Sequence, residues 1–333
     1  MEIFKNLFNT IIEFKNMSPW NWMSNSDIFA VENPATGQIG YCDIMGEGGE
    51  TFGLAVYLGN TGWRWLSDRL TDTPVDSFSM FMQNCISVTF ENAGELEPED
   101  KEIIKKLGLK FKGKNAYPLL RRYSPGHIPV MINEAEAEFL NVALQQTMML
   151  APKVKEDPNC LVSPEGDLVI RKLNKNKKGW MNHWFSPDLT PDITMPDNSF
   201  ISEIAGQIKN LRTRGSEIWA LGMFFLPEPV LDDNEKNIFF PLALVILDRK
   251  TGLILNNRLV DYNYLEKELL SLFAATVKKA GFIPSALETT MEEIYFTFSP
   301  VDELLRVKPV LSESIEVLDE MEQEMMRMFL KGK

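Results

Sequence analysis

The chain begins with an amphipathic pattern. Apolar side chains recur every three or four positions, at Ile3, Phe4, Leu7, Phe8, Ile11 and Ile12. This spacing places them on one face of a helix, which we expect to pack on the body of the protein. Glu2, Lys5 and Glu13 interrupt the apolar run and no small-residue cleavage site follows, so we do not interpret it as a secretion signal.

The next segments favour strands. Alternating, aromatic-rich and β-branched stretches occupy residues 27–33, 38–45, 52–58 and 86–90. Turn sequences at 34–37 and 46–50 separate the first three, which predicts an antiparallel meander. A helix near 61–71 follows it. The glycine-rich turn at 46–50 joins two strands and carries two glutamates, so we do not interpret it as a phosphate-binding loop.

Two further helices are marked by their ends. Pro98 begins an acidic and apolar stretch that Gly108 closes, which is the usual asymmetry of helix starts and stops. Asn133 precedes a second helix with glutamates in its first turn, where negative charge is favourable. A short strand is predicted at 109–112.

Residues 151–199 differ in character. Residues 161–173 predict a hairpin, whereas 186–198 contain three prolines and several aspartates. The latter composition disfavours regular structure and indicates a connecting segment. Asp197 is placed to cap the helix that follows.

The last third predicts a second sheet. Its strands are expected at residues 218–226, 239–247, 253–260 and 294–298. A helix from about 262 to 280 has Leu265, Leu269 and Leu272 on one face and ends at Gly281. A final helix is expected over roughly 312–330.

Together these elements predict an α+β fold with two related domains, each a mainly antiparallel sheet packed against helices. We infer an N-terminal domain at 1–150, a hairpin and Pro/Asp-rich connecting segment at 151–199, and a C-terminal domain at 200–333. Each half runs strand, strand, strand, helix, strand, helix. We interpret this shared order as an internal duplication.

Composition narrows the class of function. Acidic residues outnumber basic ones by 47 to 34, giving a net charge of −13, which disfavours nucleic acid and anionic membranes as partners. No apolar run is long enough to span a membrane. Three scattered cysteines and two histidines fit neither a disulfide framework nor a zinc motif. We therefore expect a cytoplasmic protein without a cofactor.

One basic and aromatic segment supplies candidate ligand-binding residues. Lysines at 172, 175, 177 and 178 precede Trp180, His183 and Trp184. Such side chains can bind single-stranded nucleic acid by charge and stacking. The same composition suits a surface hairpin whose tryptophans dock into a neighbouring domain, which is the interpretation that we favour. Replacing Trp180 and Trp184 together would separate these interpretations, since docking predicts a loss of stability and a binding site does not.

The element order of the second half also resembles the ribonuclease H-like fold. Its nucleases hold two divalent ions with carboxylates on the first strand, the first helix and the fourth strand. The candidates are Glu228, Glu266 or Glu268, and Asp302. The first predicted strand has no acid within its apolar run, which weighs against a nuclease. A metal-dependent phosphoester hydrolase is therefore the alternative function.

The segments Ile-Gly-Tyr-Cys-Asp-Ile-Met-Gly at 39–46 and Phe-Gly-Leu-Ala-Val-Tyr-Leu-Gly at 52–59 resemble the opening of an uncharacterised bacterial family, known only as a domain of unknown function. Residues 179–184 and the strand pair at 237–260 are similar to its second part. The resemblance covers most of the chain. It implies bacterial origin and transfers no catalytic residue.

We therefore expect a non-enzymatic binding or interaction protein of the bacterial cytoplasm. Its 17 methionines and many aromatic residues suit adaptable apolar contacts. The final helix carries Met321, Met325, Met326 and Met328, which could contact a protein partner or a second copy of the chain. Packing of this helix within its own chain is the other interpretation.

Overall fold

The computed structural model describes the chain except residues 72–76, 175, 177–178, 212, 233–236 and 332–333. It divides into two compact units. The first unit comprises residues 1–75, 82–124 and 129–189, and the second comprises 76–81, 125–128 and 190–333. The predicted fold class, α+β with mainly antiparallel sheets, is confirmed.

The first unit is built on a seven-stranded sheet. The strands, in chain order, are β1 (Phe29–Glu32), β2 (Ile39–Met45), β3 (Gly53–Leu58), β4 (Cys85–Glu91), β5 (Tyr117–Tyr123), β6 (Leu168–Leu173) and β7 (Trp180–Phe185). Their spatial order is β5-β4-β3-β2-β1-β6-β7. Neighbours are antiparallel except β1 and β6, which run parallel.

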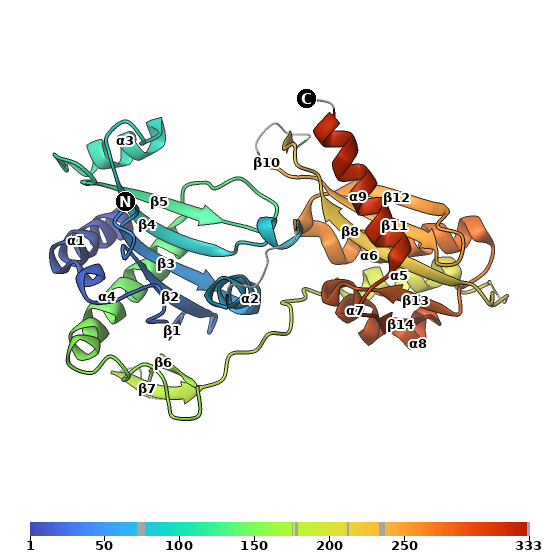
Figure 1. The fold of residues 1–333 in the computed structure, drawn as a ribbon, viewed down its shortest axis with the longest axis horizontal. Coiled ribbons are helices and arrows are strands. Elements are labelled where there is room, and N and C mark those ends of the chain that lie inside the picture. The colour runs from blue at the N-terminus through green and yellow to red at the C-terminus, as the bar shows by residue number, and fades with distance from the viewer. Residues whose placement is uncertain (72–76, 175, 177–178, 212, 233–236, 332–333) are drawn as a thin grey trace. The chain divides into compact units, whose positions relative to one another are not determined.

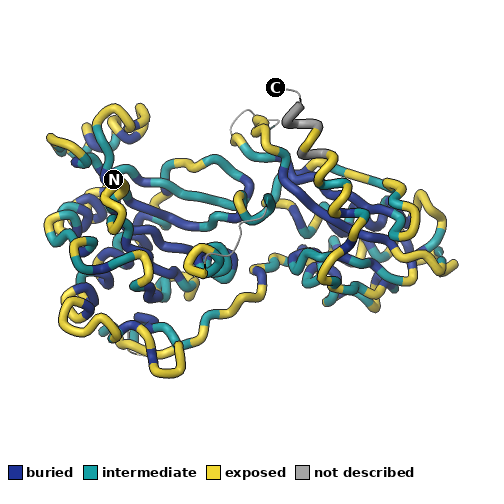
Figure 2. Tube along the Cα trace, in the orientation of Figure 1, coloured by how far each residue is buried: buried dark blue, intermediate teal, exposed yellow. Residues whose placement is uncertain are grey.

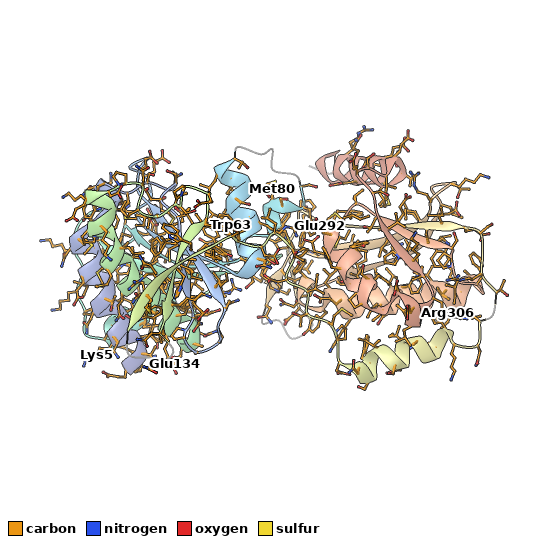
Figure 3. The ribbon with its side chains drawn as sticks, turned by 90° about the horizontal axis from the view of Figure 1, so that it is seen from below. Lys5, Trp63, Met80, Glu134, Glu292 and Arg306 are labelled. Carbon is orange, nitrogen blue, oxygen red and sulfur yellow. The ribbon has the colours of Figure 1, made fainter. Side chains whose placement is uncertain are left out.

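Helices cover both faces of this sheet. Helices α1 (Glu2–Met17) and α4 (Glu134–Glu156) pack side by side over the main core, and the amino group of Met1 pairs with Glu134 at 3.2 Å (Figures 1 and 3). Helix α2 (Gly59–Leu70) lies on the opposite face, where Trp63 packs on a strand tyrosine (Figure 3). Because side chains alternate along a strand, each strand contributes to both cores.

Local sequence signals explain how α4 begins. The Asn133 side chain accepts a hydrogen bond from the Glu136 amide at 3.0 Å, and the Glu136 carboxylate accepts one from the Asn133 amide at 2.8 Å. This capping box satisfies backbone donors that the helix cannot. It confirms the N-cap predicted at Asn133.

The second unit has a five-stranded sheet in the order β12-β11-β8-β13-β14. The strands are β8 (Ile218–Phe225), β11 (Leu242–Asp248), β12 (Ile254–Val260), β13 (Ala286–Thr289) and β14 (Lys308–Leu311), with a separate ribbon of β9 (Val230–Leu231) and β10 (Ile238–Phe239). Strands β8, β11 and β12 form an antiparallel meander. Strands β13 and β14 run parallel to β8.

Amphipathic helices accompany this sheet too. They are α5 (Asn198–Ile208), α6 (Leu265–Ala280), α7 (Glu292–Phe298), α8 (Asp302–Leu305) and α9 (Glu316–Lys331). Asp197 caps α5 through the Phe200 amide, as predicted. Leu318 of α9 packs with buried side chains of β8 and β11, so this part of the final helix packs within its own chain. The side chains of Met325, Met326 and Met328 lie outside the described residues.

Two predicted strands are wrong. Residues 294–298 form part of α7, since Ile294 and Phe298, four positions apart, are both buried on one helical face. Residues 109–112 form no strand, and the strand of this region is β5. Strand β5 was not predicted because Pro118 and two arginines interrupt its apolar pattern. An edge strand tolerates such residues.

Burial follows the sheets. Strands β2, β3, β4, β8 and β11 are mostly buried, whereas the edge strands β7, β12 and β14 are largely exposed or intermediate (Figure 2). Among the described residues, no helix combines the length and the hydrophobicity needed to span a membrane.

Candidate functional site

The three residues predicted to bind a ligand all lie on β7, at the edge of the first sheet. Trp180 pairs with Leu173, His183 with Ile170, and Trp184 with Val169. Alternation along the strand therefore places Trp180 and Trp184 on the face that packs against α4, and His183 on the other. Trp184 is 51% exposed. Lys175, Lys177 and Lys178 lie outside the described residues.

A buried arginine lies directly beside this tryptophan face. Arg171 of β6 pairs with Asn182 of β7 and is only 7% exposed. Its Nε and Nη2 donate to Gln146 Oε1 at 3.1 and 2.9 Å, and its Nη1 donates to Asn182 Oδ1 at 2.6 Å. Gln146 comes from α4 and is 4% exposed. The guanidinium is thus fixed from two elements.

The partners of Arg171 are all neutral. Within the part of the chain that the structure describes, no carboxylate forms an ion pair with it. Burial lowers the pKa of the guanidinium, and no opposite charge counters this. A guanidinium has five N–H donors, of which three are used here. Burying a charge without a counter-charge is costly, so an anion would be stabilised beside Arg171.

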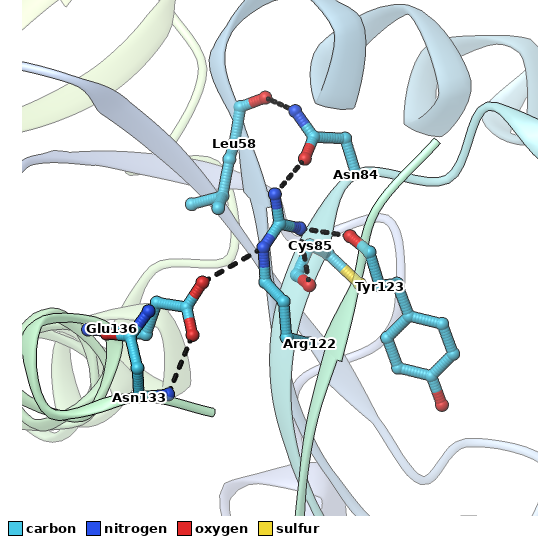
Figure 4. Close-up of polar contacts among 7 residues, drawn as sticks. All are labelled: Leu58, Asn84, Cys85, Arg122, Tyr123, Asn133 and Glu136. Carbon is cyan, nitrogen blue, oxygen red and sulfur yellow. Dashed lines mark hydrogen bonds and ion pairs between the residues drawn. The ribbon is translucent and has the colours of Figure 1, made fainter. Parts of the chain in front are cut away.

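Two other partly buried arginines of the first unit, Arg121 and Arg122, differ from Arg171 in their partners. Arg121 forms a double hydrogen bond with Asp100, at 2.8 and 2.7 Å. Arg122 contacts Glu136 through Nε at 3.1 Å and the Asn84 amide oxygen through Nη2 at 2.7 Å (Figure 4). Its Nη1 donates to the backbone oxygens of two strand residues, Cys85 and Tyr123 (Figure 4). These arginines have carboxylate partners and join strands to helices, whereas Arg171 has none.

Arg171 lines an open cavity of about 610 Å³. The lining residues are Glu13, Gln145, Gln146, Met148, Met149, Arg171 and Trp180. They combine one cation and two amides with thioethers and an indole, and Glu13 is the one acid among them. Binding pockets commonly join an apolar wall to a few polar groups that fix orientation. The arrangement suits a small organic anion with an apolar part.

Arg171 was not among the site residues predicted from the sequence. A usable signal was present. Arg171 follows Leu168-Val169-Ile170 within a strand, and alternation places it on the same face as the buried Val169. Gln146 gives a matching signal, since it is a polar residue among the buried positions of α4.

A second isolated charge lies on the opposite face of the sheet. Asp43 of β2 is 7% exposed, its Oδ1 has no hydrogen-bond partner, and burial raises the pKa of its carboxyl to about 7. Burial likewise raises the pKa of the nearby Cys85 thiol to about 12 and that of Cys42 further. Both thiols are therefore protonated at neutral pH and are poor nucleophiles.

The carboxylates considered for a metal site occupy separate places in the second unit. Glu228 is exposed after β8, Glu266 of α6 accepts from the Thr194 amide at 2.9 Å, and Asp302 accepts from the Glu303 amide at 2.6 Å. Glu268 pairs with Arg258. In the described ranges no three His, Cys, Asp or Glu side chains gather so that they could hold a metal ion. The fourth strand is β13, so Asp302 does not lie on it.

The two histidines belong to different units. His183 is exposed on β7. His127, in the second unit, has its Nδ1 2.8 Å from the Pro125 carbonyl oxygen and its Nε2 3.4 Å from Asp261 Oδ1. Neither histidine lines the Arg171 cavity.

Two family models match the chain. The Domain of unknown function (DUF7309) matches residues 4–172, just over half of the chain, and the Domain of unknown function (DUF6930) matches residues 206–326. No curated protein matches it. The predicted resemblance to a family known only as a domain of unknown function is confirmed, and neither description names an activity.

Proposed function

The chain belongs to the Domain of unknown function (DUF7309) family, and on that premise we propose that its first unit is a binding module for a small organic anion that Arg171 recognises. One observation carries the proposal. Arg171 is 7% exposed, is held by amide oxygens alone and lines a cavity of about 610 Å³.

The fixed geometry of Arg171 favours recognition of a carboxylate or phosphate. Gln146 and Asn182 hold the guanidinium from α4 and β7, so little side-chain entropy is lost when a ligand binds. The two remaining N–H donors lie one on each terminal nitrogen. An anion there completes the hydrogen bonding and supplies the missing negative charge.

The rest of the cavity favours an apolar group next to the anion. Trp180, Met148 and Met149 present an indole and two polarisable thioethers. Trp184 lies on the same face of β7, two positions beyond Asn182. Glu13 opposes additional negative charge, which favours a monoanion.

Binding without catalysis agrees with the lining. Acid–base chemistry needs a titratable side chain placed against the reacting group, and nucleophilic chemistry needs an activated Ser, Cys, Lys or Thr. Among the lining residues, Glu13 alone could act as a proton acceptor. The support for a binding protein is therefore stronger than that for an enzyme.

Calorimetry with benzoate and its neutral analogue benzamide tests the proposal. Benzoate should bind, and benzamide should bind at least tenfold more weakly. Arg171→Met should weaken benzoate binding by tenfold or more, because Arg171 is the only cation among the described residues of the lining.

Lys172→Met is the matched control. It removes one positive charge from the adjacent position of β6, where Lys172 pairs with Glu32 at 2.8 Å. Benzoate affinity should then stay within about twofold of the wild type. Equal loss in both variants, or no binding of benzoate or phenyl phosphate to the wild type, would reject the proposed function.

The cellular setting and the origin of the two units belong to the same proposal. We propose a bacterial cytoplasmic protein, on the resemblance carried by residues 39–46 and 52–59 and on the net charge of −13. An internal duplication is supported by topology, because each unit has an antiparallel meander, of five strands in the first unit and three in the second, and a later strand parallel to the first strand of that meander. A sequence profile built from relatives of one half should match the other half, and failure to match would argue against duplication.

A further inference from the structure

A second cavity, of about 380 Å³, lies beside α3 (Pro98–Lys106) in the first unit. Its lining residues are Ala93, Leu96, Lys101, Ile104, Lys105, Gly108, Leu109, Lys110 and Tyr117. None of them lines the Arg171 cavity. Apolar side chains form its wall, and the polar groups among its side chains are three lysine ammonium groups and one phenol.

The end of α3 shapes this cavity. Gly108 adopts a left-handed conformation at φ +68°, and its amide donates to the Lys105 carbonyl at 3.0 Å. The Leu109 amide donates to the Ile104 carbonyl at 3.1 Å, so Leu109 folds back beside Ile104. This glycine-dependent cap is a common way to end a helix. Here the cap places Leu109 beside Ile104 in the apolar lining of the cavity.

The charges around this wall are unbalanced. Lys101 and Lys105 are exposed on one face of α3, four positions apart, and Lys110 follows the cap. In the described part of the chain, none of the three forms a salt bridge with a carboxylate, although the charge of Lys105 contributes to the lowered pKa of Glu102. Two acids of α3 are engaged elsewhere, since Asp100 binds Arg121 and Glu102 pairs with Lys106 at 2.7 Å.

We propose that this cavity binds a free medium- or long-chain carboxylate, with the alkyl chain on the apolar wall and the head group among Lys101, Lys105 and Lys110. In a chain of net charge −13, the described residues that line this apolar cavity include three lysines and no acid, which is complementary to an anionic amphiphile. Lysine ammonium groups are mobile point charges, which suits a head group that is held by charge rather than by geometry. This site is independent of the anion site at Arg171.

Decanoate, used below the concentration at which it forms micelles, is the probe. We expect calorimetry to show saturable binding of decanoate, at least tenfold weaker binding of decanol and no binding of butyrate. The comparison of decanoate with decanol measures the contribution of the negative charge, and the comparison with butyrate measures that of the alkyl chain. Equal affinity for decanoate and decanol would overturn the role of the lysines, and equal affinity for butyrate would overturn that of the apolar wall.

Adjacent lysines provide matched variants. Lys105→Met should weaken decanoate binding several-fold, and Lys101→Met with Lys105→Met by about tenfold. Lys106→Met removes the same charge from the next position, outside the lining, and should leave the affinity within about twofold. All three lysines are exposed, so the variants should melt like the wild type. Equal losses for Lys105→Met and Lys106→Met would reject the site.

Two further measurements distinguish this cavity from the Arg171 cavity and from a membrane surface. Arg171→Met should still bind decanoate. If this variant does not bind decanoate, the ligand occupies the Arg171 cavity and the inference is wrong. Vesicles of phosphatidylcholine and phosphatidylglycerol should not sediment the protein. Sedimentation without binding of free decanoate would show a membrane contact instead of a fatty-acid site.

Discussion

At the residue scale, the buried charged side chains of the first unit fall into two groups. Arg121 and Arg122 meet carboxylates and serve the architecture, whereas Arg171 and Asp43 form no ion pair among the described residues. Arg171 lines a cavity, so a bound anion can offset the free-energy cost of burying its charge. Asp43 lies on the other face of the sheet, where protonation removes its charge instead.

Asp43 should make stability fall as pH rises. The folded state holds the proton up to about pH 7, whereas an ordinary Asp carboxyl loses it near 3.8. Between these values the folded state binds more protons, so the free energy of unfolding decreases with pH and then levels off above pH 7. Asp43→Asn removes this penalty. The variant should gain on the order of 3–4 kcal/mol over the wild type between pH 4 and pH 8.

Urea unfolding at pH 4, 6 and 8 measures this effect. A stability difference between Asp43→Asn and the wild type that does not change with pH would show that Asp43 titrates normally. The pH 4 measurement serves as the internal control, because both folded-state side chains are then neutral and only their packing differs.

At the element scale, helix α4 connects the fold to the proposed site. It begins at a capping box and carries Gln146 on its buried face, where Gln146 binds Arg171. Its next turn supplies Met148 and Met149 to the same cavity. The position of the guanidinium thus depends on the register between α4 and β6.

Removing the cap of α4 should cost stability without removing the site. Asn133→Ala leaves the Glu136 amide without its side-chain acceptor, and we expect a loss of about 1 kcal/mol. Asn133→Gly should cost only a few tenths of a kcal/mol, since glycine is tolerated at this position. Denaturant unfolding compares the two. No loss of stability in Asn133→Ala would show that the capping box does not stabilise α4.

At the scale of the whole molecule, the second unit is assembled from distant segments. Residues 76–81 and 125–128 belong to it, although the sequence around both belongs to the first unit. Within the second unit, the Phe81 ring lies 4.9 Å from that of Phe225 and 4.7 Å from that of Phe240. The Gly126 amide donates to the Phe81 carbonyl at 2.8 Å. Residues 190–333 therefore do not contain the entire unit.

Phe81→Ala should destabilise the second unit selectively. Phe81 is half-buried and touches two aromatic rings, so we expect a loss of about 1–2 kcal/mol. Hydrogen exchange followed by mass spectrometry should show faster exchange in β8 and β11 and little change in β2 and β3. Leu70→Ala, which truncates a 40% exposed side chain, is the control. Equal effects on both sheets would contradict the assignment of residues 76–81 to the second unit.

Elements whose signals are local could be predicted from the sequence alone. Periodicity predicted α1, α2, α6 and both meanders, and capping residues such as Asn133 and Asp197 located two helix starts. These features depend on neighbours within a few positions, which a sequence displays directly. The same reasoning failed at residues 294–298, because a short apolar run fits a buried helix as well as a strand.

Which side chains contact one another depends on the tertiary structure. Arg171 comes from β6, Gln146 from α4 and Asn182 from β7, and only the pairing of β6 with β7 and the packing of α4 bring them together. Alternation along β7 separates His183 from Trp180 and Trp184, and the fold of the second unit leaves the predicted carboxylates apart. Contacts between distant positions depend on strand register and helix packing, which cannot be inferred from the local patterns of a single sequence. Strand alternation in the sequence indicates that Arg171 is buried, but only the fold shows that no carboxylate of the described residues forms an ion pair with it.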